Sequence, residues 1–168
     1  MTQLYAQPYD ISATGFYFEA VDEFTAKAAN LRNAYGQPVE EFEIQCIDGD
    51  CIDCELFDAL SVNQCNLDGF FDATDNWSDD DKIKAIIAVG ECGHSFALGS
   101  DHPDKFDISL YRIGSLRELA IDFVDEGLFG DIAPSIACYI DYDAIARDLA
   151  CDYGEVVVDG INYAYRDS

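Results

Sequence analysis

Residues 154–166, GEVVVDGINYAYR, hold two runs of strand-forming side chains on either side of Asp159 and Gly160. An Asp-Gly pair between two such runs suits a two-residue hairpin turn, because both turn positions need a positive φ angle. This is the strongest short hairpin signal in the sequence. The stretch therefore predicts that the chain closes with two antiparallel strands.

The residues before this hairpin predict one more strand and two helices. Residues 106–113, FDISLYRI, alternate as a strand does. Ser115 and Glu118 then have the spacing of a helix N-cap and its capping partner. Pro134 suits the first turn of a second helix, which YIDYDAIARDL at residues 139–149 would continue.

The beginning of the chain predicts a small unit of strands and one helix. Short aromatic strands are expected at residues 3–9 and 15–20, with turn residues between them. A helix with acidic residues in its first turn is expected at 21–36, and a third strand at 39–47. Strands and helices thus come in separate blocks without a regular βαβ alternation, which predicts the α+β class.

The middle of the chain changes to a helical period. Ser61 with Gln64, and Ser78 with Asp81, each place a hydroxyl three residues before a side-chain acceptor, as at a helix start. The glycine- and serine-rich residues 90–103 are expected to form loops.

Acidic side chains dominate the composition along the whole length. The 168 residues include 34 Asp and Glu against 9 Lys and Arg, a net charge of -25. The net charge is -10 for residues 1–60, -6 for 61–105 and -9 for 106–168. The acidic residues are therefore spread along the chain and are not confined to a terminal tail. With 49% hydrophobic residues the chain should still fold. Nucleic acid and anionic membranes would repel it, so a basic partner is expected.

Sequence patterns for targeting and for disulfides point to a cytoplasmic protein. The sequence has neither a signal-like start nor an apolar run of membrane-spanning length. Seven cysteines, at irregular spacings, are expected to be reduced thiols packed as small hydrophobic side chains, with no disulfide.

The sequence contains only incomplete patterns for metal and catalytic sites. Cys51 and Cys54 have zinc-knuckle spacing, with Cys46, Cys65 or the Cys92-Gly-His94 pair nearby, but a second such pair is missing. Residues 48–59 fail the calcium-loop pattern, because Asp53 and Ala59 stand where Gly and Glu are required. His94 and His102 lie in a predicted loop, and no catalytic motif in the sequence includes them. No enzyme, metal or cofactor is expected.

The excess of acidic residues has two interpretations. In a halophilic cytosol, a high content of acidic residues would keep the protein soluble, without any specific partner. Alternatively the acids stand in for phosphates, since DNA carries one charge per ~1.7 Å of axis and 25 charges correspond to about 42 Å of duplex.

Residues 132–149, IAPSIACYIDYDAIARDL, resemble the antirestriction signature of ArdA-type proteins. The opening LYAQPY, the GFYFEA run before an acidic helix and the closing hairpin resemble that family in order and length. The matching signature positions are Pro134, Tyr139, Asp141, Tyr142, Asp143, Arg147, Asp148 and Leu149.

This resemblance implies a DNA mimic that occupies the DNA-binding cleft of type I restriction-modification enzymes, including the methyltransferase core, and inhibits them. It implies an elongated protein of three small units, here 1–60, 61–105 and 106–168, with an acidic surface throughout. It also implies a homodimer, often encoded on a mobile genetic element. The alternative is an acidic scaffolding or regulatory module that binds another basic protein.

The expected phosphate-mimicking residues are the outward acids of three helices. They are Asp79, Asp80, Asp81, Asp122, Asp125, Glu126, Asp141, Asp143 and Asp148. Within the signature, Asp143 and Arg147 have the spacing of an ion pair on one helix face. Tyr139 and Tyr142 are expected in the core, beside Ile140 and Ile145.

Overall fold

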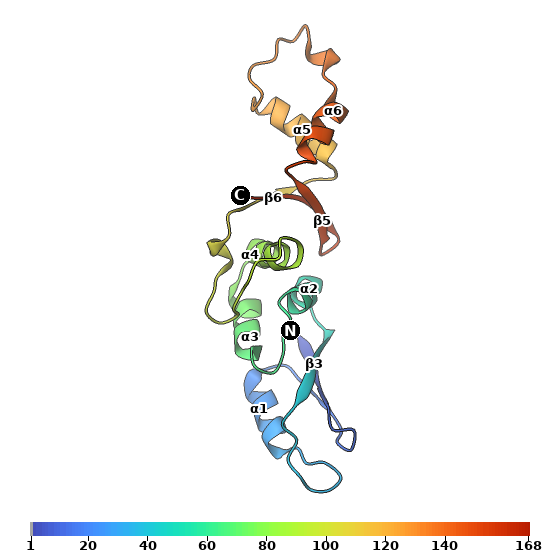
Figure 1. The fold of residues 1–168 in the computed structure, drawn as a ribbon, viewed down its shortest axis with the longest axis vertical. Coiled ribbons are helices and arrows are strands. Elements are labelled where there is room, and N and C mark those ends of the chain that lie inside the picture. Colours follow the sequence, from blue (N-terminus) through green and yellow to red (C-terminus); the bar gives the residue numbers. More distant parts are fainter. Residues whose placement is uncertain (1) are drawn as a thin grey trace. The chain divides into compact units, whose positions relative to one another are not determined.

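The computed structural model describes residues 2–168 and divides between Lys105 and Phe106 into two compact units (Figure 1). Each unit holds one three-stranded antiparallel sheet and its own helices, which confirms the α+β class. The expected division at residue 60 stays a prediction. Among the described residues, none of the helices is long and apolar enough to cross a bilayer.

The sheet of the first unit contains β1 (Gln3–Pro8), β2 (Phe16–Phe18) and β3 (Phe42–Asp48) in the order β2-β1-β3. All three strands were predicted, with β3 beginning later than expected. Leu4 and Ala6 of β1 point to the buried face of the sheet. The alternation of apolar and polar side chains thus sets which face packs on the helices.

Helix α1 (Val21–Asn30) covers that face with an aromatic cluster and ends earlier than the predicted residue 36. Phe24 lies with its ring centroid 5.1 Å from Phe18 and 5.7 Å from Phe42. The helix is cut short because the Asn33 side-chain oxygen accepts hydrogen bonds from the backbone N–H groups of Tyr35 and Gln37, both at 2.9 Å. Asparagine competes with the helix in this way by holding a turn.

Three further helices complete the first unit. They are α2 (Cys51–Ala59), α3 (Leu67–Asn76) and α4 (Asp79–Ile86), and α4 continues as a π-helical turn over Ile87–Glu91. A 3-10 turn follows at Pro103–Lys105. Residues 92–102 form a loop, as predicted, whereas Gly90 and Pro103 at the ends of the predicted range lie in the two helical turns.

The two predicted helix starts in this region have opposite outcomes. The capping box of Ser78 and Asp81 is confirmed at the start of α4. The cap of Ser61 and Gln64 is wrong, because Asn66 precedes α3 instead. The Gln64 side-chain oxygen instead accepts a hydrogen bond from the Phe42 N–H at 2.8 Å, at the start of β3.

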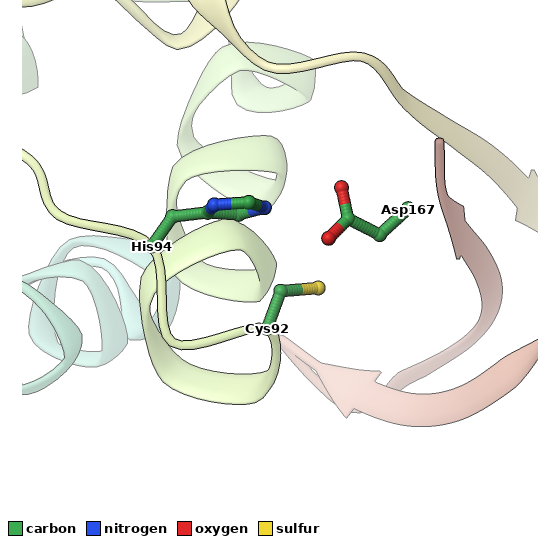
Figure 2. A group of neighbouring side chains, drawn as sticks. All are labelled: Cys92, His94 and Asp167. Atoms are coloured by element: carbon green, nitrogen blue, oxygen red, sulfur yellow. The ribbon is translucent and has the colours of Figure 1, made fainter.

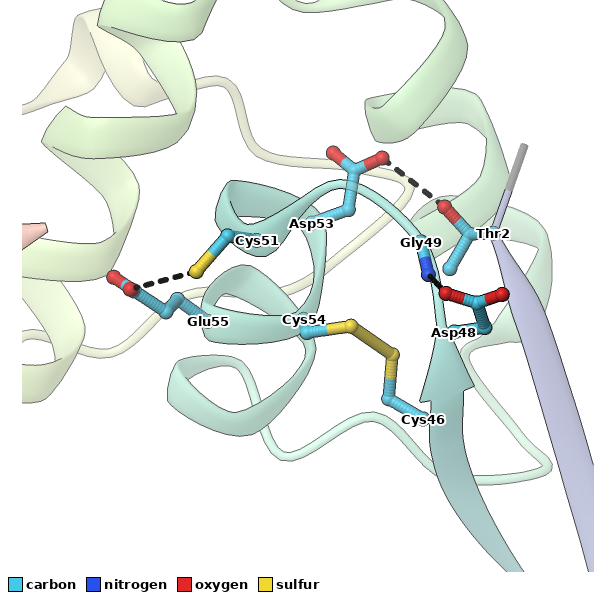
Figure 3. Close-up of a disulfide and its surroundings, with 8 residues drawn as sticks. All are labelled: Thr2, Cys46, Asp48, Gly49, Cys51, Asp53, Cys54 and Glu55. Carbon is cyan, nitrogen blue, oxygen red and sulfur yellow. Dashed lines mark hydrogen bonds between the residues drawn. A yellow bond between two sulfur atoms is a disulfide. The ribbon is translucent and has the colours of Figure 1, made fainter. Parts of the chain in front are cut away.

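Cysteine chemistry differs from the expectation. Cys46 at the end of β3 and Cys54 in α2 form a disulfide (Figure 3). The turn between β3 and α2 brings their Cα atoms to 5.9 Å, a distance suited to a disulfide that the spacing did not reveal. Cys51, Cys65, Cys138 and Cys151 are exposed. The prediction of seven reduced cysteines, packed as small hydrophobic side chains, is therefore wrong.

A buried ion pair joins α4 to α2. The Lys82 ammonium nitrogen lies 2.7 Å from Oδ1 of Asp53, and both side chains are nearly inaccessible. The same nitrogen is 3.3 Å from the Thr74 carbonyl oxygen in α3, and the Thr2 hydroxyl donates to Oδ2 of Asp53 at 3.1 Å. Figure 3 shows the contact between Thr2 and Asp53.

The sheet of the second unit contains β4 (Ile108–Arg112), β5 (Gly154–Val158) and β6 (Ile161–Asp167) in the order β4-β6-β5. The closing hairpin is confirmed: Val158 pairs with Ile161, and the turn residues Asp159 and Gly160 have φ angles of 51° and 70°. Such angles at both positions match the twist of the two strands.

The helices of the second unit are α5 (Leu116–Asp125) and α6 (Tyr142–Leu149), with a 3-10 turn at Ala137–Tyr139 between them. Leu116, Leu119 and Phe123 of α5 are buried against Ile113 and Ala164, as the apolar stripe of the sequence predicts. Leu149 of α6 packs against the same cluster. This small core fixes which faces of α5 and α6 point outward.

The ion pair of Lys82 and Asp53 generates a test of the fold. We expect Asp53→Ala to lower the free energy of unfolding of the first unit by about 3–5 kcal/mol, because it leaves a buried ammonium without its partner. The double variant Lys82→Met with Asp53→Leu should recover most of that loss. Urea unfolding followed by Trp77 fluorescence measures both. A double variant as unstable as Asp53→Ala would contradict the explanation that an unpaired Lys82 ammonium causes the loss of stability.

Candidate acidic interaction surface

The predicted partner-binding acids lie on one helix of the first unit and two helices of the second. In α4 the acids occupy the first helical turn. In α5 they occupy the last turn and the C-cap, and in α6 they lie at the start and near the end. Each group has a different electrostatic environment.

The acids of α4 lie where a helix favours negative charge. Asp79 and Asp80 are exposed in the first turn, beside the positive end of the helix dipole. Asp81 is half-buried, and its Oδ2 accepts hydrogen bonds from the Ser78 hydroxyl at 2.6 Å and the Ser78 N–H at 3.2 Å. These bonds lower the pKa of Asp81 below its ordinary value, chiefly through the Ser78 hydroxyl. Asp81 is therefore charged and also caps the helix.

The acids of α5 lie where a helix disfavours negative charge. Asp122, Asp125 and Glu126 are exposed at the C-terminal end, and the sequence has no Lys or Arg between residues 118 and 130. The dipole and the unpaired carbonyl groups favour cations there. The pKa of Tyr111 is raised by burial first, then by Tyr153 and the charge of Glu126. This turn thus concentrates negative charge against the preference of the helix.

The signature segment folds differently from the prediction at its start. Pro134 lies in a turn and does not open an α-helix, since the chain passes through the 3-10 turn before α6 begins at Tyr142. The helix starts there because Oδ1 of Asp141 accepts a hydrogen bond from the Ala144 N–H at 2.9 Å. Asp141 is thus the N-cap of α6 and remains exposed.

The ion pair of the signature has a different partner from the one predicted. Oδ1 of Asp143 lies 3.0 Å from Nε of Arg117 in α5, so the predicted pairing with Arg147 is wrong. The Arg117 guanidinium also lies over the Tyr142 ring, 5.8 Å from its centroid. Arg117 thereby links the outer faces of α5 and α6, a cross-helix contact that the spacing along one helix cannot reveal.

The two signature tyrosines are not core residues. Tyr139 is 82% exposed, and Tyr142 is half-buried under Arg117. Their expected place in the core is wrong, because the small cluster around Phe123 is filled by Tyr111 and Tyr153. Arg147 and Asp148 are exposed on α6.

An exposed apolar group lies between α5 and α6 in sequence and was not predicted. Its members are Leu128, Phe129, Ile136 and Tyr139, each more than half exposed. The same connection borders a pocket of about 260 Å³ with Asp125 and Tyr142 in its lining. Exposed apolar side chains of this size are candidates for contact with a protein partner.

Basic side chains are used to pair individual acids. Lys27 lies 2.7 Å from Glu23, and Lys105 lies 2.7 Å from Asp101. Each pair lowers the pKa of its acid, chiefly through the lysine hydrogen bond. Because these bases bind at specific positions, they do not neutralise the outward acids of α4 and α5.

The zinc-knuckle and calcium-loop patterns of the sequence do not form metal sites in the described residues. The disulfide occupies Cys46 and Cys54, so these two cannot complete a zinc knuckle, and the acidic segment after Asp50 is helix α2 and no calcium loop. Figure 2 shows Cys92 and His94 at the end of the π-helical turn. Asp167, also drawn there, belongs to the second unit.

In comparisons with known proteins, no family model and no curated protein matches the chain.

Asp79 lies at the N-terminal end of α4 and Asp125 at the C-terminal end of α5, so the two residues can be compared in a test of the helix dipole. We expect Asp125→Asn to raise the local stability of α5 by about 0.3–1 kcal/mol, because a charge is removed from the unfavourable end of the dipole. Asp79→Asn should lower the stability of α4 by a similar amount. Hydrogen exchange of the helix amides at low ionic strength measures both changes. Shifts of the same sign, or shifts unaffected by added salt, would refute this electrostatic account.

Proposed function

We propose that this protein is a non-enzymatic DNA mimic. It occupies the DNA-binding cleft of a type I restriction-modification enzyme and inhibits that enzyme. The observation that carries the proposal is the cluster of Asp122, Asp125 and Glu126 at the C-terminal end of α5. These carboxylates cost helix stability where they are. A partner with complementary charge gives a reason for keeping them.

The spacing of these acids suits a phosphate mimic. Side chains three and four positions apart share one helix face, with Cβ atoms about 5–6 Å apart. A DNA strand carries one phosphate per ~3.4 Å of helix axis. A basic cleft built for phosphates would therefore meet carboxylates at comparable density on α5, with Asp148 adding charge on α6.

Both units carry enough charge to take part. Residues 1–105 hold 21 acidic and 5 basic residues, and residues 106–168 hold 13 and 4. We infer that the acidic surface extends over both, on an elongated protein of small units, with Asp79 and Asp80 as the contribution of α4. Because the attraction is long-range, binding should be fast and sensitive to salt.

The second candidate function is an acidic scaffolding or regulatory module for another basic protein. Four exposed apolar side chains favour it, because a DNA duplex presents no such side chains to a protein cleft. They are Leu128, Phe129, Ile136 and Tyr139. Partner range separates the two functions. A mimic shaped like duplex favours enzymes with a DNA-sized cleft, whereas a generic polyanion binds lysozyme equally well.

Displacement of DNA tests the proposed function. The protein is titrated into a type I methyltransferase core preloaded with labelled cognate DNA, at two salt concentrations. We expect release of the DNA at near-stoichiometric protein, weaker at high salt, where polyglutamate of matched charge fails. Displacement no better than that by polyglutamate would mean that the acidity is generic.

A charge-matched pair of variants locates the surface. The variant Asp122→Asn, Asp125→Asn and Glu126→Gln should inhibit about tenfold less well, at roughly 0.5 kcal/mol for each exposed contact. Each single change should matter little.

The control removes three exposed acids elsewhere, as Glu40→Gln, Glu41→Gln and Asp58→Asn. It has the same net charge as the first variant. Equal losses in the two variants would mean that only total charge counts, and one alanine substitution abolishing inhibition without unfolding would indicate a localised hot spot.

We further infer that the protein is a homodimer that buries the apolar group around Tyr139. A self-contact would cover the exposed aliphatic and aromatic side chains of the connection between α5 and α6. Tyr35 in the first unit provides a matched control, because it is also 82% exposed. Sedimentation velocity should show that Tyr139→Ser weakens self-association while Tyr35→Ser does not. A monomeric unmodified protein at high concentration would overturn this inference.

A further inference from the structure

Three potential metal-ligand side chains meet in the first unit, away from the acids of α5 and α6. They are Asp81 in the first turn of α4, His102 just before the 3-10 turn and Asp104 within it, and their ligand atoms all lie within 4.8 Å of one another. Nδ1 of His102 lies 3.2 Å from a carboxylate oxygen of Asp104. Sequence patterns do not group these residues, because the rest of α4, the π-helical turn and most of the loop lie between Asp81 and His102.

The position of His102 is set by aromatic packing. Its ring lies edge-on to Trp77 with the centroids 5.7 Å apart, and Phe96 packs on Trp77 at the same distance. Lys105 lies over the Phe96 ring, 5.2 Å from its centroid, and its ammonium group binds the Asp101 carboxylate at 2.7 Å. The loop is thus held around Trp77, and this packing brings the imidazole to α4.

The carboxylate of Asp81 is oriented by a separate set of contacts. Both hydrogen bonds from Ser78 reach Oδ2 of Asp81, which leaves Oδ1 for another ligand. The same hydrogen bonds keep Asp81 ionised, as a metal ligand must be. Outer contacts that hold a ligating carboxylate in place are a regular part of metal sites.

The donor set selects a class of metal ion. One imidazole nitrogen and two carboxylate oxygens suit Zn²⁺, Co²⁺ or Ni²⁺, whereas Mg²⁺ and Ca²⁺ prefer oxygen ligands alone. Ligand distances of about 2.0–2.2 Å require the three donor atoms to close in slightly. His102 and Asp104 are exposed and therefore able to make that adjustment.

We propose that Asp81, His102 and Asp104 form a binding site for one divalent transition-metal ion of the zinc class, with water in the remaining positions. Three protein ligands with water at an open position match the ligand number of zinc sites that keep one position open. The bound ion fastens the loop before Lys105 to the start of α4. It also places positive charge beside Asp79 and Asp80. This site is independent of the proposed inhibition.

Trp77 provides the measurement, because it is the only tryptophan in the chain and contacts His102. Metal-stripped protein is titrated with Zn²⁺ and Ni²⁺, followed by Trp77 fluorescence and by calorimetry, with Mg²⁺ as the control for loose counterions. We expect saturation at one zinc-class ion per chain and no comparable response to Mg²⁺. A non-saturating response, or an equal response to Mg²⁺, would overturn the proposal.

The other histidine of the chain serves as the matched control. His102→Gln and Asp104→Asn should each weaken binding by at least tenfold, since even an outer contact of a metal site contributes about 10- to 100-fold. His94→Gln should leave the affinity unchanged. If His94→Gln or Cys92→Ser abolishes binding and His102→Gln does not, the ion binds near the π-helical turn and the proposed site is wrong. Circular dichroism confirms that each variant is folded.

Discussion

The Lys82 ammonium group lies in the interior of the first unit, 2.7 Å from the Asp53 carboxylate. A buried charge is tolerated only when it is paired and hydrogen-bonded, so the segments around it must keep their places. Asp53 fixes α2, the carbonyl of Thr74 fixes the end of α3, and Thr2 brings in the start of the chain. Four parts of the first unit are thus held by one lysine in a protein with a net charge of -25.

The acids of this chain serve two different purposes. Some are structural: Asp81 and Asp141 cap helices, and Asp143 pairs with Arg117 across α5 and α6. Each of these contacts contributes stability or orientation. Asp125 and its neighbours on α5 do the opposite, because they crowd like charges at the negative end of a helix. The contrast separates acids that build the fold from acids that are available to a partner.

Turns and helix caps could be predicted from the sequence, because they depend on neighbouring residues. Contacts between residues distant in the sequence could not. The hairpin at Asp159 and the cap at Ser78 depend on neighbouring residues, so their patterns are visible in the sequence. The contacts of Lys82 and Arg117 depend on how helices pack, and the expected partner of Asp143 was accordingly wrong. The exposed acids on the helices could be nominated from periodicity. The exposure of Tyr139 could not, because it follows from a core too small to include it.

The division between Lys105 and Phe106 has a consequence for protein synthesis. Every strand, helix and buried contact of the first unit comes from residues that leave the ribosome before the second unit does. Domains generally fold as units during translation, with the N-terminal one first. The first unit can therefore bury Lys82 and close its core while the second is still being translated.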